Sequence, residues 1–379
     1  MNFNLTEEHL MIRDAAKDFA KSELLPGVIE RDELQSFPEQ QIKKLGELGF
    51  MGMMVDQKYG GAGMDTISYV LAMEEISKID ASCSVAMSVN NSLVCWGIET
   101  FGTEFQKEKY LKPLAKGEML GAFCLSEPEA GSDATSQKTT AVDCGDHYIL
   151  NGTKNWITNG NSASIYLVIA QTDVEKKHKG INAFIVEKGM KGFEVGKKEN
   201  KLGIRGSDTH SVMFTDVKVP KKNRIGDDGF GFTFAMKTLS GGRIGIAAQA
   251  LGIASGAYEL SLKYSKERKA FGKEISNHQA IAFKLADMIT EINAARLLCL
   301  KAAWLKDNNQ NYDRASAMAK VYSSETAMKT TTEAVQIHGG YGFVKEYHVE
   351  RLMRDAKITQ IYEGTSEIQR IVISRSILK

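Results

Sequence analysis

The stretch FAMKTLSGGRIGIAAQALGIASGAYELSLK, residues 234–263, combines helix-period apolar residues with several small ones. It contains no proline, the residue that most strongly interrupts a helix. Small side chains let one helix approach a neighbour closely, and six of them recur here: Gly245, Ala247, Ala248, Gly252, Ala254 and Gly256. The stretch therefore predicts a long helix packed tightly in a bundle.

The absence of proline extends over the whole C-terminal part of the chain. All five prolines lie at or before Pro220, so the last 159 residues contain none. Apolar residues recur at helical spacing in four segments: Phe234–Lys263, Ile275–Leu305, Asp313–Ile337 and a final one from Thr365. We expect a four-helix bundle over residues 229–379.

The N-terminal region, residues 1–120, also has helical spacing. Thr6 is the expected N-cap of the first helix, whose buried face is predicted to hold Met11, Ala15, Ala16, Phe19 and Ala20. Gly60–Gly63 interrupts the pattern, and Asp65 is expected to cap the next helix. The region is predicted to be an α-helical domain.

Strand signals replace the helical pattern in residues 121–228. Short runs rich in β-branched and aromatic residues alternate with turn residues: 147–150, 165–170, 181–186 and 211–219. They predict a small antiparallel sheet domain, of sandwich or barrel-like form. The expected fold class is thus mainly α with a central β-domain.

Composition excludes several classes of protein. Charged residues make up 25% of the chain and hydrophobic residues 43%, as in ordinary globular proteins. The net charge of +1 gives no reason to expect a nucleic acid or an anionic membrane as partner. The five cysteines are scattered and no metal-ligand spacing is present, so we expect a reducing compartment and no metal.

Met1–Leu5 shows no targeting signal, no membrane span is predicted, and a cytoplasmic location is expected.

Four segments carry residues that could bind a ligand, although ordinary loop or packing roles are the alternative for each. Residues 125–133 offer bare backbone N–H groups and a hydroxyl at Gly131-Ser132, which can cradle a phosphate or a polar ring edge. Residues 156–160 place an indole and a hydroxyl at a strand end. Residues 268–273 form a basic turn after a helix, and 336–342 end a helix with glycines that permit close approach.

The segment IYEGTSEIQR, residues 361–370, is the most informative. Glu363 precedes Gly364 just before a new helix, for which Thr365 or Ser366 is the expected cap. The carboxylate could serve in capping alone. Held in an apolar cleft, it would have a raised pKa and could act as a general base.

Together these segments resemble the acyl-CoA dehydrogenase family over essentially the whole chain. The resemblance rests on LSEPEAGSDA, WITNG, ERKAFGK, QIHGGYG and QIYEGTSEIQR, in that order. Within the family, residues 88–93 and 201–207 are similar to those of the short-chain, butyryl-CoA members. The family fold consists of an N-terminal helical domain, a middle β-domain and a C-terminal four-helix bundle.

The resemblance implies FAD-dependent α,β-dehydrogenation of an acyl-CoA, with butyryl-CoA as the first choice of substrate. Glu363 would remove the α-proton while the β-hydrogen leaves as hydride to flavin N5. The flavin ribityl 2′-hydroxyl and the backbone N–H of Glu363 would stabilise the thioester oxygen. The expected electron acceptor is an electron-transferring flavoprotein, reached by way of Trp156.

The resemblance also assigns binding residues. Those matching flavin contacts within one chain are Phe123, Leu125, Ser126, Gly131, Ser132, Trp156, Thr158, Thr365 and Glu367. Those matching contacts to the FAD of a neighbouring subunit are Arg268, Phe271, Gln279, Gln336, Gly339 and Gly340, so a homotetramer, a dimer of dimers, is expected. The substrate residues are Ser132, Ser240, Arg243 and Gly364.

Two positions bear on these assignments. Some family members carry the base one residue before the arginine that matches Arg243, but that residue is Gly242, which cannot ionise. Ser240 stands where the family often has an Asp at the adenine end of CoA, a departure that bears on nucleotide recognition. The alternatives are a branched short-chain dehydrogenase, an acyl-CoA oxidase, a flavin monooxygenase and, remotely, a DNA-binding relative.

Overall fold

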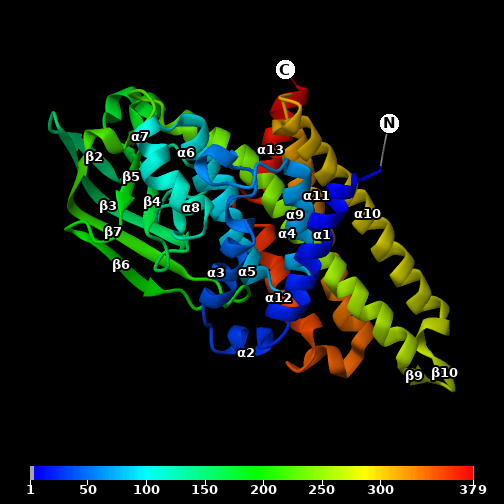
Figure 1. Ribbon diagram of the computed structural model, residues 1–379. Coiled ribbons are helices and arrows are strands. Elements are labelled where there is room, and N and C mark those ends of the chain that lie inside the picture. The colour runs from blue at the N-terminus through cyan, green and yellow to red at the C-terminus, as the bar shows by residue number, and fades with distance from the viewer. Residues whose placement is uncertain (1–3, 379) are drawn as a thin grey trace.

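The computed structural model describes residues 4–378; Met1–Phe3, part of the stretch in which no targeting signal is expected, lies outside this range. The chain forms N-terminal helices, a β-sheet and a C-terminal set of long helices (Figure 1). The sheet lies on one side of the molecule and the long helices on the other, with N-terminal helices between them. Within residues 4–378, no helix is both long and apolar enough to cross a membrane.

The N-terminal helices confirm most of the predicted boundaries. Thr6 caps the first of them through its side chain, and Asp65 caps α4. The predicted face of α1 is partly wrong, because Met11 is 72% exposed and Ala15 is also exposed, whereas Ile12 is buried. The helices are α1 (Glu7–Phe19), α2 (Val28–Glu33), α3 (Glu39–Glu47), α4 (Thr66–Ser77), α5 (Ala81–Ser88), α6 (Trp96–Phe101), α7 (Glu104–Gln106) and α8 (Lys112–Ala115).

The sheet contains the four predicted strand regions and further strands that the sequence did not reveal. Its strands are β1 (Gly121–Cys124), β2 (Thr140–Asp143), β3 (His147–Thr158), β4 (Ile165–Gln171), β5 (Ile181–Glu187), β6 (Phe193–Lys198), β7 (Thr209–Pro220) and β8 (Arg224–Ile225). Strand order is β6-β7-β3-β2-β4-β5-β8, with β1 beside β4. The purely antiparallel prediction is wrong, because β1 and β2 pair with β4 in parallel.

Strand β4 is buried on both faces, which joins the sheet to the helices. Ile165, Leu167 and Ile169 belong to a core shared with N-terminal helices and the start of α9. Tyr166 and Val168, which point the other way, belong to a second core inside the sheet region. This two-sided burial explains why the strand is a continuous apolar run rather than an alternating one.

The C-terminal helices include the predicted segments and one additional helix. They are α9 (Gly231–Glu267), α10 (Gln279–Asp307), α11 (Asp313–His338), α12 (His348–Thr359) and α13 (Ser366–Ile377). A small hairpin, β9 (Lys269–Ala270) and β10 (Lys273–Glu274), joins α9 to α10. The additional helix α12 contacts both α9 and α11, whereas the predicted final helix, α13, contacts α11.

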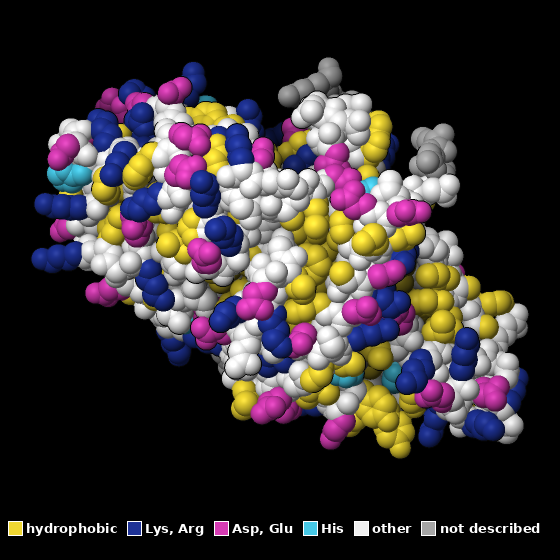
Figure 2. Space-filling view, in the orientation of Figure 1, with side chains coloured by type: hydrophobic (Ala, Val, Ile, Leu, Met, Phe, Trp, Pro, Cys, Tyr) yellow, Lys and Arg dark blue, Asp and Glu magenta, His cyan; other side chains and the backbone are white. Residues whose placement is uncertain are grey.

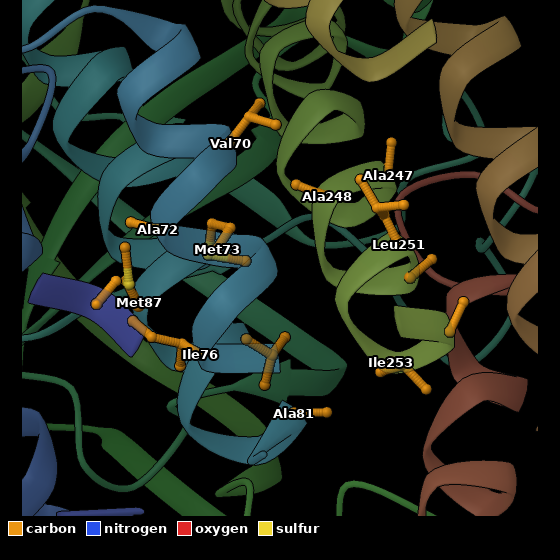
Figure 3. Close-up of a cluster of buried hydrophobic side chains, with 14 of the residues drawn as sticks. Val70, Ala72, Met73, Ile76, Ala81, Met87, Ala247, Ala248, Leu251 and Ile253 are labelled. Atoms are coloured by element: carbon orange, nitrogen blue, oxygen red, sulfur yellow. The ribbon is translucent and has the colours of Figure 1, made fainter. Parts of the chain in front are cut away.

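The small residues of α9 allow the close packing that the sequence predicts. A Cβ added at Gly252 would lie 2.4 Å from the carbonyl oxygen of Glu74, on α4. One added at Gly245 would lie 2.5 Å from the Tyr69 hydroxyl oxygen, also on α4. Figure 3 shows the result, in which side chains of α4 and α5 face Ala248, Leu251 and neighbouring residues of α9. The N-terminal helices and the bundle therefore share one core.

We predict that Gly252→Ala destabilises the protein by about 1–3 kcal/mol, because the methyl group would meet backbone that cannot move aside. The matched control is Gly241→Ala on the same helix, where the nearest atom to an added Cβ is 3.9 Å away. Because alanine has a higher helix propensity than glycine, Gly241→Ala should raise the free energy of unfolding by up to about 1 kcal/mol. Urea unfolding measures both variants, and equal stabilities would contradict the packing account.

Candidate active site

Glu363 lies in a strained turn between α12 and α13. Its φ is +50°, which is uncommon for a residue other than glycine, and Gly364 follows with φ +91°. Gln369 Nε2 donates hydrogen bonds to the carbonyl oxygens of Glu363, at 3.2 Å, and Gly364, at 2.8 Å. Lys320 Nζ donates a further one to the Gly364 carbonyl at 2.7 Å. Thr365 caps α13, as predicted, by accepting from the Ile368 N–H.

The Glu363 carboxylate points into the bundle, toward α9. Glu363 is partly exposed, but its Oε2 atom is buried and has no hydrogen-bond partner among residues 4–378. A Cβ added at Gly242 would lie 2.1 Å from this oxygen and 2.6 Å from Leu93 Cδ2. The carboxylate thus occupies space left by a missing side chain, beside an apolar wall. Such an orphaned acceptor is available to a ligand.

Burial raises the pKa of Glu363 to about 7, although the cations of Lys320 and Arg243 act in the opposite direction. A carboxylate with a pKa near neutrality can exchange a proton efficiently at physiological pH. Arg243 is the residue after Gly242 on α9 and is only 6% exposed. Ser240 is also buried, and its hydroxyl donates to the Met236 carbonyl of its own helix at 3.2 Å.

The predicted flavin residues of the sheet region converge on one place. Phe123 is the last residue but one of β1, and Leu125 and Ser126 directly follow that strand. Trp156 and Thr158 lie at the end of β3. The Asn155 N–H donates to the Ser126 carbonyl at 2.9 Å, which joins the two segments. Gly131 and Ser132 lie on the exposed loop between β1 and β2.

This sheet cluster adjoins the helix that packs against Glu363. The rings of Phe123 and Phe234 lie 6.4 Å apart, and Phe234 is eight residues before Gly242 on α9. At 1.5 Å rise per residue the two positions are roughly 12 Å apart along the helix. The structure thereby brings the sheet cluster and the carboxylate to neighbouring parts of α9.

Thr365 and Glu367 lie at the start of α13, close after Glu363 in the chain, whereas the residues predicted to contact a neighbouring subunit's FAD gather elsewhere. Arg268 ends α9, Phe271 lies at the tip of the β9–β10 hairpin, and Gln279 begins α10. Gly339 and Gly340 follow α11 after the exposed Gln336. A groove of about 470 Å³ is lined by Tyr264, Arg268, Ile275, Ile337, His338, Gly339, Gly340 and Tyr341. The hairpin lies at the end of the molecule remote from the sheet (Figure 1), so one chain does not unite the two clusters.

Both clusters present an exposed aromatic ring and open backbone. Trp156 has φ +57° and its side chain is 57% exposed; Phe271 has φ +52° and is 96% exposed. Local structure explains both φ values, because Phe271 and Gly272 form the two-residue turn of the β9–β10 hairpin and Trp156 lies at an irregularity in the pairing of β3 with β7. The exposure of the two rings is what leaves aromatic surface free for a ligand. Cβ atoms added at Gly131, Gly339 or Gly340 would meet nothing within 4 Å. Both clusters therefore have the open backbone and aromatic surfaces that fit a large ring-bearing cofactor.

Sequence reasoning missed the buried cations around these sites. Lys154 has no exposed surface and donates to the Leu125 carbonyl at 3.1 Å and to Glu127 Oε1 at 2.7 Å. Burial lowers its pKa to about 8, and Glu127 opposes that effect. Lys320 is equally buried. A lysine on a helix face otherwise made of small residues, as in 316–327, was the signal that could have revealed it.

Residues 4–378 contain no cluster of three or more His, Cys, Asp or Glu side chains that could hold a metal ion. His338 stacks on Tyr264 with 4.3 Å between ring centroids, and burial lowers its pKa. It serves the packing of the second cluster.

Comparison with known proteins identifies the family. Residues 6–118 match the model of the acyl-CoA dehydrogenase N-terminal domain, 122–217 that of the middle domain and 229–378 that of the C-terminal domain. The chain therefore belongs to the acyl-CoA dehydrogenase family, a family of oxidoreductases with this three-domain fold.

Individual relatives are similar over their whole length. The chain is 52% identical over 379 residues to the short-chain specific acyl-CoA dehydrogenase of Clostridium acetobutylicum, with both chains fully covered. Butyryl-CoA dehydrogenase from Megasphaera elsdenii superposes with a TM-score of 0.99 at 50% identity and full coverage of both chains. A chain from the structure described as "Electron transferring flavoprotein of Acidaminococcus fermentans: Towards a mechanism of flavin-based electron bifurcation" gives 0.99 at 53% identity, again with full coverage.

The raised pKa of Glu363 makes stability depend on pH. From its ordinary value of 4.5 up to about 7, the folded state binds the proton more tightly than the unfolded chain, so stability falls as pH rises. Glu363→Gln removes this loss. The free energy of unfolding of the variant, relative to wild type, should rise by about 3 kcal/mol between about pH 4 and pH 8. Urea titrations across this range measure it, and a difference independent of pH would refute the raised pKa.

Proposed function

We propose that the protein catalyses the FAD-dependent α,β-dehydrogenation of a short-chain acyl-CoA, preferably butyryl-CoA, to the trans-2-enoyl-CoA. The observation that carries the proposal is that Glu363 Oε2 is buried against Gly242 and has no hydrogen-bond partner in the described part of the chain. Removal of a proton from the carbon next to a thioester requires a base held in place with a pKa near the working pH. Glu363 meets both requirements, and Gly242 removes the competing position for a base.

Glu363 takes the α-proton on its carboxylate. The cations of Arg243 and Lys320 favour the ionised form that the reaction needs, while burial keeps the carboxylate basic. Proton removal places negative charge on the thioester oxygen, which preorganised donors must stabilise. The N–H of Glu363 donates no hydrogen bond to another residue of 4–378 and is available as one donor.

The two aromatic and glycine-rich clusters would hold FAD. When bound, FAD supplies the acceptor for the β-hydrogen and its electron pair. The residues that would hold it in one subunit are Phe123, Leu125, Ser126, Gly131, Ser132, Trp156, Thr158, Thr365 and Glu367. The second cluster lies at the end of the molecule remote from the sheet. Its residues would therefore contact the FAD of a neighbouring subunit: Arg268, Phe271, Gln279, Gln336, Gly339 and Gly340.

The substrate and its chain length follow from the site and the relatives. Ser132, Arg243 and Gly364 would contact the acyl-CoA. Ser240, whose hydroxyl is engaged by its own helix, would line the same region without the carboxylate that many relatives have there. Similarity to a short-chain specific enzyme and to a butyryl-CoA dehydrogenase supports a short acyl group.

Assembly and electron transfer complete the proposal. Exposed aromatic and aliphatic side chains lie along α10, at Phe283, Leu297 and Trp304, and Figure 2 shows hydrophobic side chains gathered over the helical part of the molecule. These surfaces support a homotetramer, built as a dimer of dimers. Similarity to the chain from the Acidaminococcus work supports an electron-transferring flavoprotein as acceptor.

The domain limits and the compartment are also part of the proposal. The limits we propose are 1–120, 121–228 and 229–379, close to the residues that the three family models match. All five cysteines are unpaired, four of them buried, as suits the reducing cytoplasm.

Glu363→Gln is expected to retain FAD but to lose bleaching of the flavin absorbance by butyryl-CoA. Loss of a general base lowers the rate by about 10²–10⁴-fold. Anaerobic stopped-flow absorbance measures the bleaching, with the exposed Glu118→Gln as the matched control. Bleaching of the flavin in Glu363→Gln at a near wild-type rate would contradict the assignment of Glu363 as the base.

Chain-length preference is tested with acyl-CoA substrates of four to sixteen carbons and a dye acceptor. We expect kcat/KM to be highest at four carbons and to fall by about tenfold or more by eight, since misfit of a few methylenes has effects of this size. A maximum at longer chains, or with isobutyryl-CoA, would contradict butyryl-CoA as the substrate. Reoxidation of the reduced flavin faster by O₂ than by the flavoprotein would instead indicate an oxidase.

A further inference from the structure

Lys320 is a buried cation near Glu363, and no substrate or cofactor contact is assigned to it above. It lies on α11, its side chain has no exposed surface, and its hydrogen-bond acceptor is a neutral carbonyl, that of Gly364, at 2.7 Å. Burial of an ammonium group opposite a neutral acceptor is unfavourable, and an apolar side chain of similar volume would avoid that cost. Its presence therefore calls for a role at this position.

Its hydrogen bond reaches the peptide that follows the base. The carbonyl belongs to Gly364, and the preceding residue is Glu363, with its φ of +50°. Gln369 supports the same turn from α13 through a neutral amide. Two donors thus hold a backbone conformation that is unfavourable in itself, and one of the two is charged.

We propose that Lys320 is a positioning residue for Glu363: it anchors the base-bearing turn through the Gly364 carbonyl, and its positive charge favours the carboxylate form of the base. This inference rests on the proposed function of Glu363. Two tasks are involved, anchoring the turn and favouring the ionised carboxylate. Gln369 and Lys320 both anchor the turn, but of these two only Lys320 carries a charge.

The charged and titratable groups around the carboxylate support this division. Lys320 from α11 and Arg243 from α9 both favour its ionised form. Tyr69 from α4 and Tyr362 from the preceding turn also lie near it, and burial raises the pKa of each, with the carboxylate adding to the effect. Burial lowers the pKa of Lys320 to about 7, and Glu363 opposes that effect. Each member of the pair thus stabilises the charged form of the other, and their titrations are coupled.

The test uses the FAD-loaded protein and reads the proton on Glu363 directly. The infrared carbonyl stretch of protonated Glu363, identified by its absence in Glu363→Gln, is followed as a function of pH. Two neutral variants, Lys320→Met and Lys320→Gln, remove the charge, and Gln369→Leu removes the uncharged anchor. Lys329→Met is the matched control, because Lys329 lies on the same helix but is exposed and paired with Glu291.

Both neutral Lys320 variants should raise the pKa of Glu363 by about 1 or more, the effect of losing a nearby opposite charge. Fewer ionised molecules near neutral pH should then lower kcat by about fivefold, with recovery at higher pH and KM nearly unchanged. Gln369→Leu should lower kcat at every pH without moving the pKa of Glu363. Lys329→Met should change neither.

The inference is overturned if a neutral Lys320 variant melts like wild type and binds FAD but leaves the pKa of Glu363 unchanged. A pKa change of equal size in Gln369→Leu would overturn the division of tasks. The infrared measurement decides these points without turnover. Failure of the proposed function, seen as bleaching that persists in Glu363→Gln, would therefore be a separate result.

Discussion

The contact between the Glu363 carboxylate and Gly242 is the constraint on which the rest of the site depends. A carboxylate oxygen fits against α9 only because that position has no side chain. The fit removes Oε2 from water and leaves it without a hydrogen-bond partner among residues 4–378, and burial raises the pKa of Glu363 to about 7. The same few atoms thus supply the position of the base and its proton affinity.

The small-residue face of α9 connects this contact to the whole fold. At Gly245 and Gly252 the N-terminal helices approach α9 closely, and near its start Phe234 packs against Phe123 of the sheet. One helix therefore positions all three domains relative to the carboxylate. Trp156, Phe271 and Glu363 are three of the nine residues other than glycine in 4–378 that have a positive φ, so backbone strain accompanies the proposed binding and catalytic residues but is not confined to them.

Periodicity and proline content predicted most of the long helices and four of the strands, because these depend on local sequence, whereas the role of Glu363 was implied by the family resemblance of residues 361–370. Strands β1, β2, β6 and β8 were missed because they are short or carry few β-branched and aromatic residues. The parallel pairing with β4 was missed because the pairing partners are distant in the chain. Met11 was assigned to the buried face although Ile12 occupies it. Lys154 was missed because only tertiary packing buries it, whereas the small residues around Lys320 in 316–327 were a signal that was not used.

Exchange of α-protons with solvent, without any net oxidation, tests most directly the claim that Glu363 is a base held at its reacting position. Acetyl-CoA has an α-carbon but no β-carbon, so it can lose a proton yet cannot be dehydrogenated. In D₂O, NMR should show the wild-type protein incorporating deuterium into the acetyl methyl group and Glu363→Gln failing to do so. Exchange that continues in the variant, or that is absent from the wild type, would contradict the account.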